Sequence, residues 1–308
     1  MGVCMAKNFL TLMDYPEKEI RKILELAKKI KAGNSEGRLE GQTLAMLFEK
    51  TSTRTRVSFE VAMNQLGGHA AYLDSRTTKL AEKETLKDTI RVLERYCDAI
   101  MARVYRHSDL EEMSSISKIP VINGLSDLYH PCQTLADLLT VIEKKGKIED
   151  LKVSFFGDCA FNMGRSTMIG FSKLWANVFL VCPDKAKYLP DPEFLEKVRK
   201  YVKGNVRIEN DPVKGMKDAD VVITDKWISP GQEKEEKQRT RDFKKYQVSS
   251  ELVKHAKQGF IFLHCLPALR GYEVTNDVID SRNSVVFDEA ENRLHTEKAL
   301  LLYLLKDD

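Results

Sequence analysis

One stretch of this chain combines side chains that bind anions with the start of a helix. Residues 52–56 read Ser-Thr-Arg-Thr-Arg and follow an apolar run at 43–48. Hydroxyl groups, guanidinium groups and the free N–H groups of a first helical turn form an anion site, because a helix N-terminus carries partial positive charge. The planar fork of Arg54 suits phosphate or carboxylate. An ordinary N-cap beside a surface arginine gives the same pattern, so both readings stay open.

Other polar side chains follow apolar runs elsewhere in the chain. They are Arg103, His130, Gln133, Asn162, Asp225, Ser229 and Cys265. A single histidine is more often structural than catalytic, and nothing near Cys265 in the sequence lowers its pKa, so a nucleophilic role is not indicated. The turn at 157–158 lacks the GxGxxG pattern, and a dinucleotide site is therefore not expected.

The elements that must position these side chains alternate along the chain. Apolar runs predict strands at 43–48, 69–73, 99–104, 120–122, 153–156, 178–182, 221–224, 260–263 and 285–287. Helical spacing predicts helices between most of them. This alternation predicts an α/β protein with two domains, each a mainly parallel sheet flanked by helices. A charged, glycine-containing stretch at 144–150 divides them, giving domains 1–145 and 146–291. In such sheets, ligands bind beyond the carboxyl ends of the strands.

Composition excludes several classes of protein. The 308 residues include 49 Lys and Arg and 46 Asp and Glu. The resulting net charge of +3 is too small for a protein that binds nucleic acid through a general positive field. No apolar run approaches the length of a membrane span, and no secretory leader is visible. The six cysteines include no CxxC pair. We therefore expect a cytoplasmic protein with reduced thiols and no partner of nucleic acid or membrane.

Four motifs, taken together, resemble those of the aspartate/ornithine carbamoyltransferase family. Residues 48–60, Phe-Glu-Lys-Thr-Ser-Thr-Arg-Thr-Arg-Val-Ser-Phe-Glu, resemble the carbamoyl phosphate site, and His-Pro-Cys-Gln at 130–133 resembles the second shared motif. Asp-Lys-Trp-Ile-Ser-Pro-Gly at 225–231 and His-Cys-Leu-Pro at 264–267 are similar to the two motifs of the ornithine-specific members. The four occur in the family's order and extend over nearly the whole chain.

The resemblance implies a reaction and an architecture. Carbamoyl phosphate and L-ornithine give L-citrulline and phosphate, in arginine biosynthesis or catabolism, with no metal and no organic cofactor. The first domain is expected to bind carbamoyl phosphate and the second to bind ornithine, with the active site in the cleft between them. A C-terminal helix at 292–308 is expected to pack back onto the first domain. The family likeness also implies a homotrimer or a multiple of trimers.

The resemblance implies site residues, which lie in these four motifs and at four further positions that match the family, Lys79, Arg103, Asn162 and Arg293. For carbamoyl phosphate they are Ser52, Thr53, Arg54, Thr55, Lys79, Arg103, His130, Gln133, Cys265, Leu266 and Arg293. For ornithine they are Asn162, Asp225, Ser229 and Pro230. Arg103, His130 and Cys265 are expected to take part in catalysis. Cys265 is expected to orient the attacking amine and handle its proton, not to form a covalent intermediate.

Two positions depart from the family pattern. Pro230 replaces a methionine in the loop that closes over ornithine in the family, and residues 232–245 read as a solvated, mobile lid. Lys79 replaces a glutamine that reaches a neighbouring subunit's site in many ornithine enzymes, and an ordinary solvated lysine is the alternative. The rival functions are transfer to another amine, such as putrescine or aspartate, and an inactive ligand-binding homologue.

Overall fold

The computed structural model describes residues 7–34, 37–75, 84–229 and 231–306. By internal contacts the chain forms two units, residues 1–132 with 293–308, and residues 133–292. The sequence analysis placed this boundary after residue 145, and α5 (Pro131–Lys145) accounts for the difference, because its first two residues belong to unit 1 and the rest to unit 2. The chain returns to unit 1 within the last helix, α12 (Val286–Leu305).

Unit 1 is built on a four-stranded parallel sheet in the order β2-β1-β3-β4. Buried, mostly apolar side chains fill β1, β3 and β4, as expected for strands covered on both faces, whereas the edge strand β2 is partly exposed. Its elements are η1 (Leu12–Asp14), α1 (Glu17–Lys31), β1 (Thr43–Phe48), α2 (Thr53–Gln65), β2 (His69–Asp74), α3 (Leu86–Leu93), β3 (Ala99–Arg103), α4 (His107–Ile116) and β4 (Val121–Leu125).

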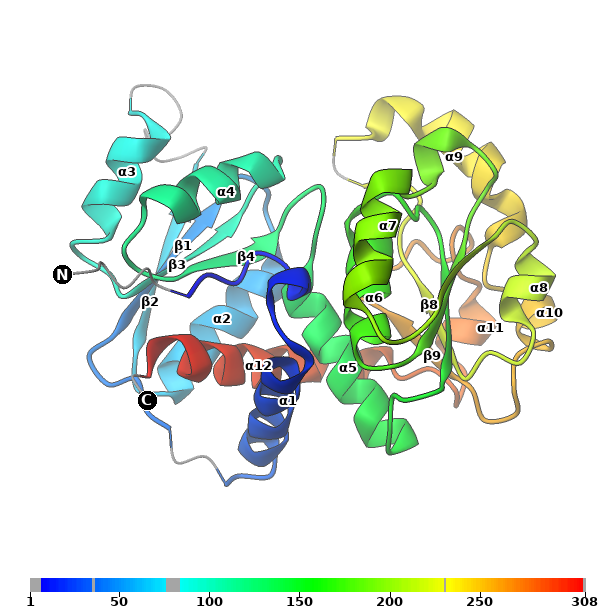
Figure 1. Cartoon of the computed structure of the whole chain (residues 1–308), viewed down its shortest axis with the longest axis horizontal. Coiled ribbons are helices and arrows are strands. Elements are labelled where there is room, and N and C mark those ends of the chain that lie inside the picture. The colour runs from blue at the N-terminus through cyan, green and yellow to red at the C-terminus, as the bar shows by residue number, and fades with distance from the viewer. Residues whose placement is uncertain (1–6, 35–36, 76–83, 230, 307–308) are drawn as a thin grey trace. The chain divides into compact units, whose positions relative to one another are not determined.

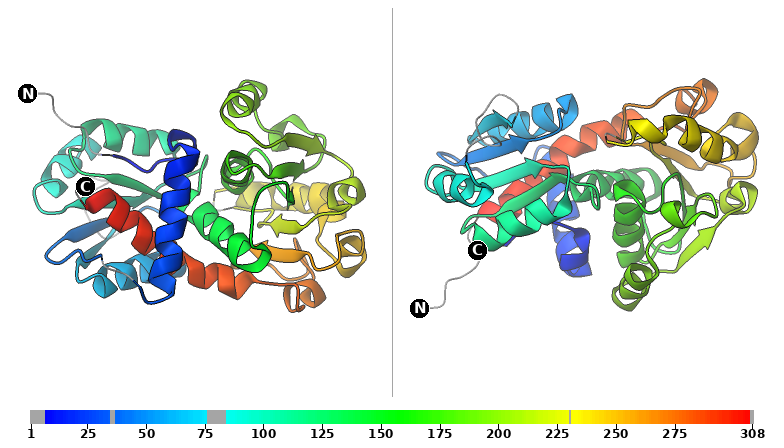
Figure 2. Two further views of the ribbon diagram at one scale, coloured as in Figure 1. Left: turned by 60° about the horizontal axis from the view of Figure 1, so that its bottom comes forward. Right: turned by 90° about the horizontal axis from the view of Figure 1, so that it is seen from above.

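The crossovers of unit 1 reverse direction between β1 and β3. The chain moves from β1 outward to β2, then back across to β3 and on to β4. Because parallel crossovers are right-handed, this reversal places α2 on one face of the sheet and α3 and α4 on the other (Figures 1 and 2). The loops after β1 and β3 therefore diverge, and the point of divergence is where such sheets bind ligands.

Unit 2 repeats this plan with five parallel strands in the order β7-β6-β5-β8-β9. The reversal lies between β5 and β8, so the loops after those strands diverge. Its elements after α5 are β5 (Lys152–Phe156), α6 (Asn162–Lys173), β6 (Asn177–Val181), η3 (Ala186–Tyr188), α7 (Pro192–Tyr201), β7 (Val206–Glu209), α8 (Pro212–Met216), β8 (Val221–Thr224), η4 (Glu233–Glu235), α9 (Glu236–Phe243), η5 (Lys244–Tyr246), α10 (Ser250–Val253), β9 (Ile261–His264) and α11 (Asn276–Ile279).

The α/β class and the two parallel sheets are confirmed, with two corrections to the strands. The strand predicted at 285–287 is wrong: only Ser284 bridges Phe262, and Val286 already begins α12. Residue Phe287 is exposed, so the apolar run does not mark a buried strand. Strand β7, at the edge of its sheet, was not predicted, because two of its four residues are charged.

Within the described ranges, no helix combines the length and the apolar composition that crossing a membrane requires.

Candidate functional site

The first group of candidate residues lies at the carboxyl ends of β1 and β3 in unit 1. Ser52 caps α2, since its Oγ accepts the Thr55 N–H at 3.3 Å. The capped first turn leaves Thr55 buried and Arg54 exposed. Strands β1 and β3 are neighbours in the sheet, and Phe48 pairs with Arg103, so the half-buried Arg103 lies at the same sheet edge as the loop that carries Arg54.

The charges of three arginines act on the ring of His130. Its ring is buried, and burial followed by the charges of Arg293, Arg103 and Arg54 holds its pKa well below the ordinary histidine value. The imidazole is therefore neutral near pH 7, while the arginines keep their charge. We call these four residues the arginine cluster. Several fixed cations around a neutral hydrogen-bonding ring are suited to a small dianion.

The Arg293 side chain is held in place by its own helix. Its Nε donates to Glu297 Oε1, one turn further along α12, at 3.0 Å. Both side chains are buried, so the carboxylate compensates part of the charge that the arginine brings into the interior. Burial raises the pKa of Glu297, with Arg293 and Ser58 opposing the shift.

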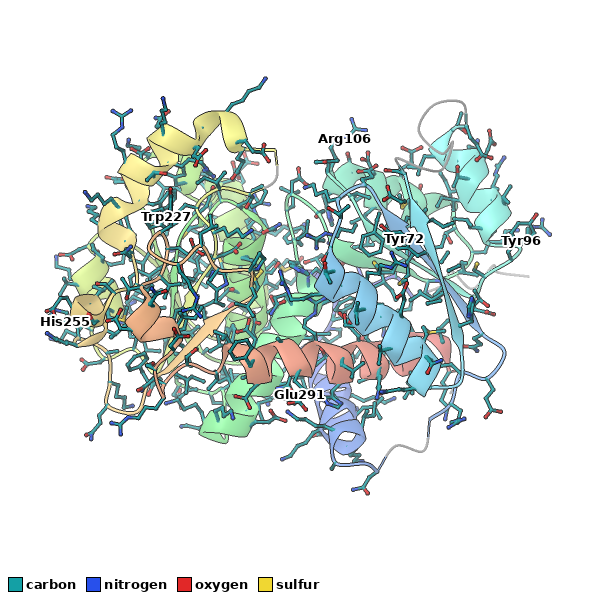
Figure 3. All side chains as sticks on the ribbon, turned by 180° about the vertical axis from the view of Figure 1, so that it is seen from behind. Tyr72, Tyr96, Arg106, Trp227, His255 and Glu291 are labelled. Carbon is teal, nitrogen blue, oxygen red and sulfur yellow. The ribbon has the colours of Figure 1, made fainter. Side chains whose placement is uncertain are left out.

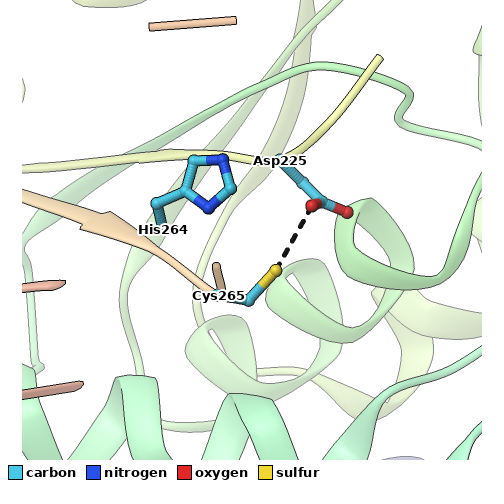
Figure 4. Close-up of side chains that lie close together, drawn as sticks. All are labelled: Asp225, His264 and Cys265. Atoms are coloured by element: carbon cyan, nitrogen blue, oxygen red, sulfur yellow. Dashed lines mark hydrogen bonds between the residues drawn. The ribbon is translucent and has the colours of Figure 1, made fainter. Parts of the chain in front are cut away.

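The second group of candidate residues lies in unit 2, at the carboxyl ends of β8 and β9. Figure 4 shows the Cys265 thiol directed at the Asp225 carboxylate, and Sγ donates to Oδ1 at 3.2 Å. Burial, then the charge of Asp225, raises the pKa of Cys265 well above its ordinary value. The group is therefore a protonated thiol near pH 7, which makes it a hydrogen-bond donor and a poor nucleophile.

The donor atoms of Asp225, His264 and Cys265 lie within 4.8 Å of one another, which raises the question of a metal site. The imidazole of His264 has no lone pair available for one. Its Nδ1 accepts the Leu266 N–H at 2.9 Å, which places the ring proton on Nε2, facing Glu273 Oε1 at 3.0 Å. Both nitrogens thus hold the loop after β9, and the chemistry of this group is positioning rather than metal binding.

The backbone of that loop adopts an unusual conformation. Leu266 has φ of 53°, a region that a residue with a Cβ rarely occupies, and the Leu266–Pro267 peptide is cis. Glu273 also accepts the Leu269 N–H, at 2.6 Å, so one buried carboxylate anchors the loop at both ends. A non-glycine residue with a φ like that of Leu266 persists where its surroundings fix it, and such residues occur often at ligand-binding loops.

Asn162 and Ser229 follow β5 and β8, the two strands whose loops diverge. Asn162 is buried and opens α6. Ser229 is buried, and its N–H donates to Gln232 Oε1 at 3.0 Å. The neighbouring Pro230, and Lys79 in unit 1, are outside the described residues.

The segment expected to be a solvated lid contains an anchored helix. In α9, Arg239 is 2% exposed and forms an ion pair with Asp158, which follows β5. Phe243 of the same helix is buried and stacks against Trp227 at 6.1 Å between ring centroids; Figure 3 labels Trp227 beside this helix. The expectation of a solvated segment is wrong at Arg239 and Phe243, which are buried, whereas its other charged side chains are exposed or partly exposed. That the segment is a mobile lid stays a prediction.

The sequence analysis missed the buried groups that support these loops. They are Asp137, Asp158, Arg239, Glu273, Glu289 and Glu297. Sequence spacing carried one usable signal, because Gln133 and Asp137, like Arg293 and Glu297, stand four residues apart on a helix and so share a face. The other contacts join residues distant in sequence, such as Asp158 and Arg239.

Comparison with known proteins agrees with this division into two sets of residues. The carbamoyl-P binding domain model of the aspartate/ornithine carbamoyltransferases matches residues 7–143. The Asp/Orn binding domain model of the same enzymes matches residues 149–304. The chain belongs to the aspartate/ornithine carbamoyltransferase family.

Relatives within this carbamoyltransferase family are similar over almost their full length. The ornithine carbamoyltransferase of Pyrococcus abyssi is 53% identical, with 97% of this chain and 96% of that protein covered. The anabolic ornithine carbamoyltransferase of Pyrococcus furiosus is 52% identical over the same shares. Among solved structures, the Pyrococcus furiosus ornithine carbamoyltransferase has a TM-score of 0.90 at 51% identity, and 99% of each chain is covered.

The buried His130 predicts a specific loss of stability in acid. Above about pH 6.5 the ring is neutral in both folded and unfolded chains. Below it, the unfolded chain binds a proton that the folded chain excludes, so the free energy of unfolding falls by about 1.4 kcal/mol per pH unit until the folded pKa is reached. Denaturant titrations of wild type and His130→Gln between pH 7.5 and 5 measure the difference.

The exposed His69 is the matched control for this measurement. The acid loss should remain in His69→Gln and be reduced in His130→Gln. Equal acid slopes in wild type and His130→Gln would contradict the pKa direction given for His130.

The Arg239–Asp158 pair predicts a large stability change in unit 2. Replacing Arg239 by Met leaves a buried carboxylate without its counter-charge, so we expect a loss of about 3–5 kcal/mol in the free energy of unfolding. Adding Asp158→Asn should restore part of it. Lys254→Met removes the exposed pair with Glu251 and should cost under about 1 kcal/mol. Equal losses from Arg239→Met and Lys254→Met would show that the buried pair has no special role.

Proposed function

We infer that this protein transfers the carbamoyl group of carbamoyl phosphate to the δ-amino group of L-ornithine, forming L-citrulline and phosphate. One observation carries this inference. The chain is a member of the carbamoyltransferase family, and it has both the arginine cluster and the Asp225–Cys265 contact. That contact lies in loops similar to those of the ornithine-specific enzymes. Relatives at about 50% identity named ornithine carbamoyltransferase support the same acceptor.

We propose that unit 1 binds the phosphate dianion. The N–H groups and hydroxyls at 52–55, with Arg54 and Arg293, hold the phosphate oxygens. Arg103, the neutral His130 and Thr55 donate to the carbonyl oxygen, where negative charge develops as the amine attacks. Such donors lower the barrier most when they are fixed before the reaction, as burial fixes the His130 ring. Lys79 is proposed as a further phosphate contact.

We propose that unit 2 binds and orients ornithine. Asp225 and Ser229 hold the α-amino group and Asn162 the carboxylate, while Pro230 belongs to the same loop. The thiol of Cys265 lies beside the δ-amine. An alkyl amine is mostly protonated at pH 7, so the δ-amine must lose a proton before it attacks. Asp225 and Cys265 orient the amine for that step.

The proposed reaction is a direct transfer. The δ-nitrogen forms a bond to the carbonyl carbon, the carbonyl oxygen takes up the electron pair, and the tetrahedral intermediate expels phosphate by breaking the bond between carbon and the bridging oxygen. The departing phosphate accepts the remaining proton. The C=O group of Leu266 and the amide of Gln133 hold the carbamoyl nitrogen. A protonated Cys265 thiol supports an orienting role rather than a covalent one.

The setting of the reaction is also a proposal. The five described cysteines are free thiols, which fits a reducing cytoplasm. The anabolic name of the Pyrococcus furiosus relative supports the biosynthetic direction, in the formation of arginine. A homotrimer, or a multiple of it, follows from the family resemblance.

An acceptor panel tests the function. We expect purified protein with carbamoyl phosphate to form citrulline from ornithine, and little product from putrescine, aspartate or N-acetylornithine. Colorimetric ureido detection and phosphate release measure the two products. Preference for another amine would move the protein to a different acceptor class, and no transfer to any amine would support an inactive homologue.

The arginine cluster predicts a matched pair of variants on α2. Arg54→Ala should lower kcat/KM for carbamoyl phosphate by about 10²–10³-fold, because it removes a cation from the proposed phosphate site. Arg56→Ala should stay near wild type, since Arg56 instead pairs with Glu60 at 2.9 Å and covers the Tyr72 ring. Unchanged kinetics in Arg54→Ala, measured at fixed ionic strength, would remove Arg54 from the site.

A further inference from the structure

The amide of Gln133 is held by two buried carboxylates. Its Nε2 lies 2.9 Å from Asp137 Oδ1 and 2.8 Å from Glu289 Oε1. Asp137 follows one turn later on α5, and Glu289 lies in the first turn of α12. All three side chains are 1% exposed or less, so water does not compete for these hydrogen bonds.

The chemistry of the two acceptors fixes which way the amide faces. An ionised carboxylate only accepts hydrogen bonds, and the –NH2 group of a glutamine offers two hydrogens. Asp137 and Glu289 therefore take both hydrogens of Gln133. The side-chain carbonyl oxygen, Oε1, is turned to the opposite side, where it can only accept.

Glu289 also connects this amide to the loop after β9. Its second oxygen, Oε2, accepts the His264 N–H at 2.8 Å. One carboxylate thus joins the Gln133 side chain to the backbone directly before Cys265 and Leu266. The side chain of Gln133 and the backbone of the 264–267 motif are held in a fixed relation within unit 2.

We propose that Asp137 and Glu289 are positioning residues that force Gln133 to present its carbonyl oxygen to the –NH2 group of carbamoyl phosphate. This rests on the proposed function. An oxygen that only accepts favours a substrate with N–H groups and gives nothing to an acyl phosphate that lacks them. The pair thereby determines selectivity between carbamoyl phosphate and acetyl phosphate, which has a methyl group in place of the –NH2.

The variants that test this proposal keep the shape of the side chain and change which hydrogen bonds it can donate or accept. In Glu289→Gln and Asp137→Asn the new amide can donate as well as accept, so the Gln133 amide is free to rotate. Exposed Glu291, labelled in Figure 3 on the same helix as Glu289, provides the control variant Glu291→Gln. Circular dichroism and thermal unfolding establish that each variant is folded.

Three ligands separate the expected effect from general damage. We expect the KM for carbamoyl phosphate to rise about tenfold in Glu289→Gln, the effect of one lost hydrogen bond. The inhibition constants of acetyl phosphate and of inorganic phosphate, measured against carbamoyl phosphate, should stay at the wild-type values. The preference of Glu289→Gln for carbamoyl over acetyl phosphate is then smaller than that of wild type by the same factor. The Glu291→Gln variant should keep the wild-type preference.

Two results would overturn the proposal. The first is a folded Glu289→Gln variant with an unchanged preference for carbamoyl over acetyl phosphate. The second is an equal loss of affinity for all three ligands, which indicates a merely structural role. If Glu289→Gln does not fold, Asp137→Asn is measured by the same criteria and decides. If the wild-type protein forms no citrulline, the proposed function is wrong. If the wild-type protein is active and either of these two results is found, only the positioning role of Asp137 and Glu289 is wrong.

Discussion

Parallel pairing of the strands is the constraint on which the rest of this protein depends. Strands that run in one direction end at one edge, and in each sheet the chain reverses direction once. Because the crossovers are right-handed, the helices before and after the reversal lie on opposite faces of the sheet. The reversal opens a gap between two loops, after β1 and β3 in unit 1 and after β5 and β8 in unit 2. The candidate residues at 52–55, Arg103, Asn162, Asp225 and Ser229 follow the strands beside those reversals, whereas His130, Gln133, Cys265 and Leu266 follow the neighbouring strands β4 and β9. The same physical rule thus creates two binding places from sequences that share no motif.

The two places differ in charge, and the difference matches the two substrates. In unit 1 burial and the charges of three guanidinium groups keep an imidazole neutral. In unit 2 carboxylates lie near the thiol of Cys265, and burial, followed by the charges of Asp225, Glu289 and Asp137, raises its pKa. This difference fits the proposal that the first set binds a dianion and the second a diamino acid. A net charge of +3 for the whole chain conceals both fields.

Much of the fold was predictable, because short apolar runs between helical patterns mark buried parallel strands. The core of β1, β3, β5, β8 and β9 follows directly from such runs. Strand β7 was not predicted because an edge strand needs fewer apolar residues. The run at 285–287 was wrongly predicted as a strand because its apolar residues stand at the start of a helix. The local sequence pattern alone does not predict which other elements a segment will pack against.

The site was predictable only in part, for a related reason. Residues proposed to touch substrate belong to motifs or to single positions that match the family, and the resemblance identified them. Those that hold them in place, such as Glu289 behind Gln133 or Glu273 behind His264, are single acids in ordinary surroundings. Their role arises from a partner far away in the chain. Hydrogen-bond geometry is what reveals them.

Arg239 bears on how residues 232–245 can change during evolution. Of the charged side chains in this segment, it is the one that is buried; the others face solvent wholly or in part. Substitutions among the solvent-facing charges alter solubility and surface potential with little effect on packing. Mutational drift can therefore rewrite most of this segment, and the sequence of a distant relative could look unrelated here while one arginine and its aspartate partner preserve the same backbone path.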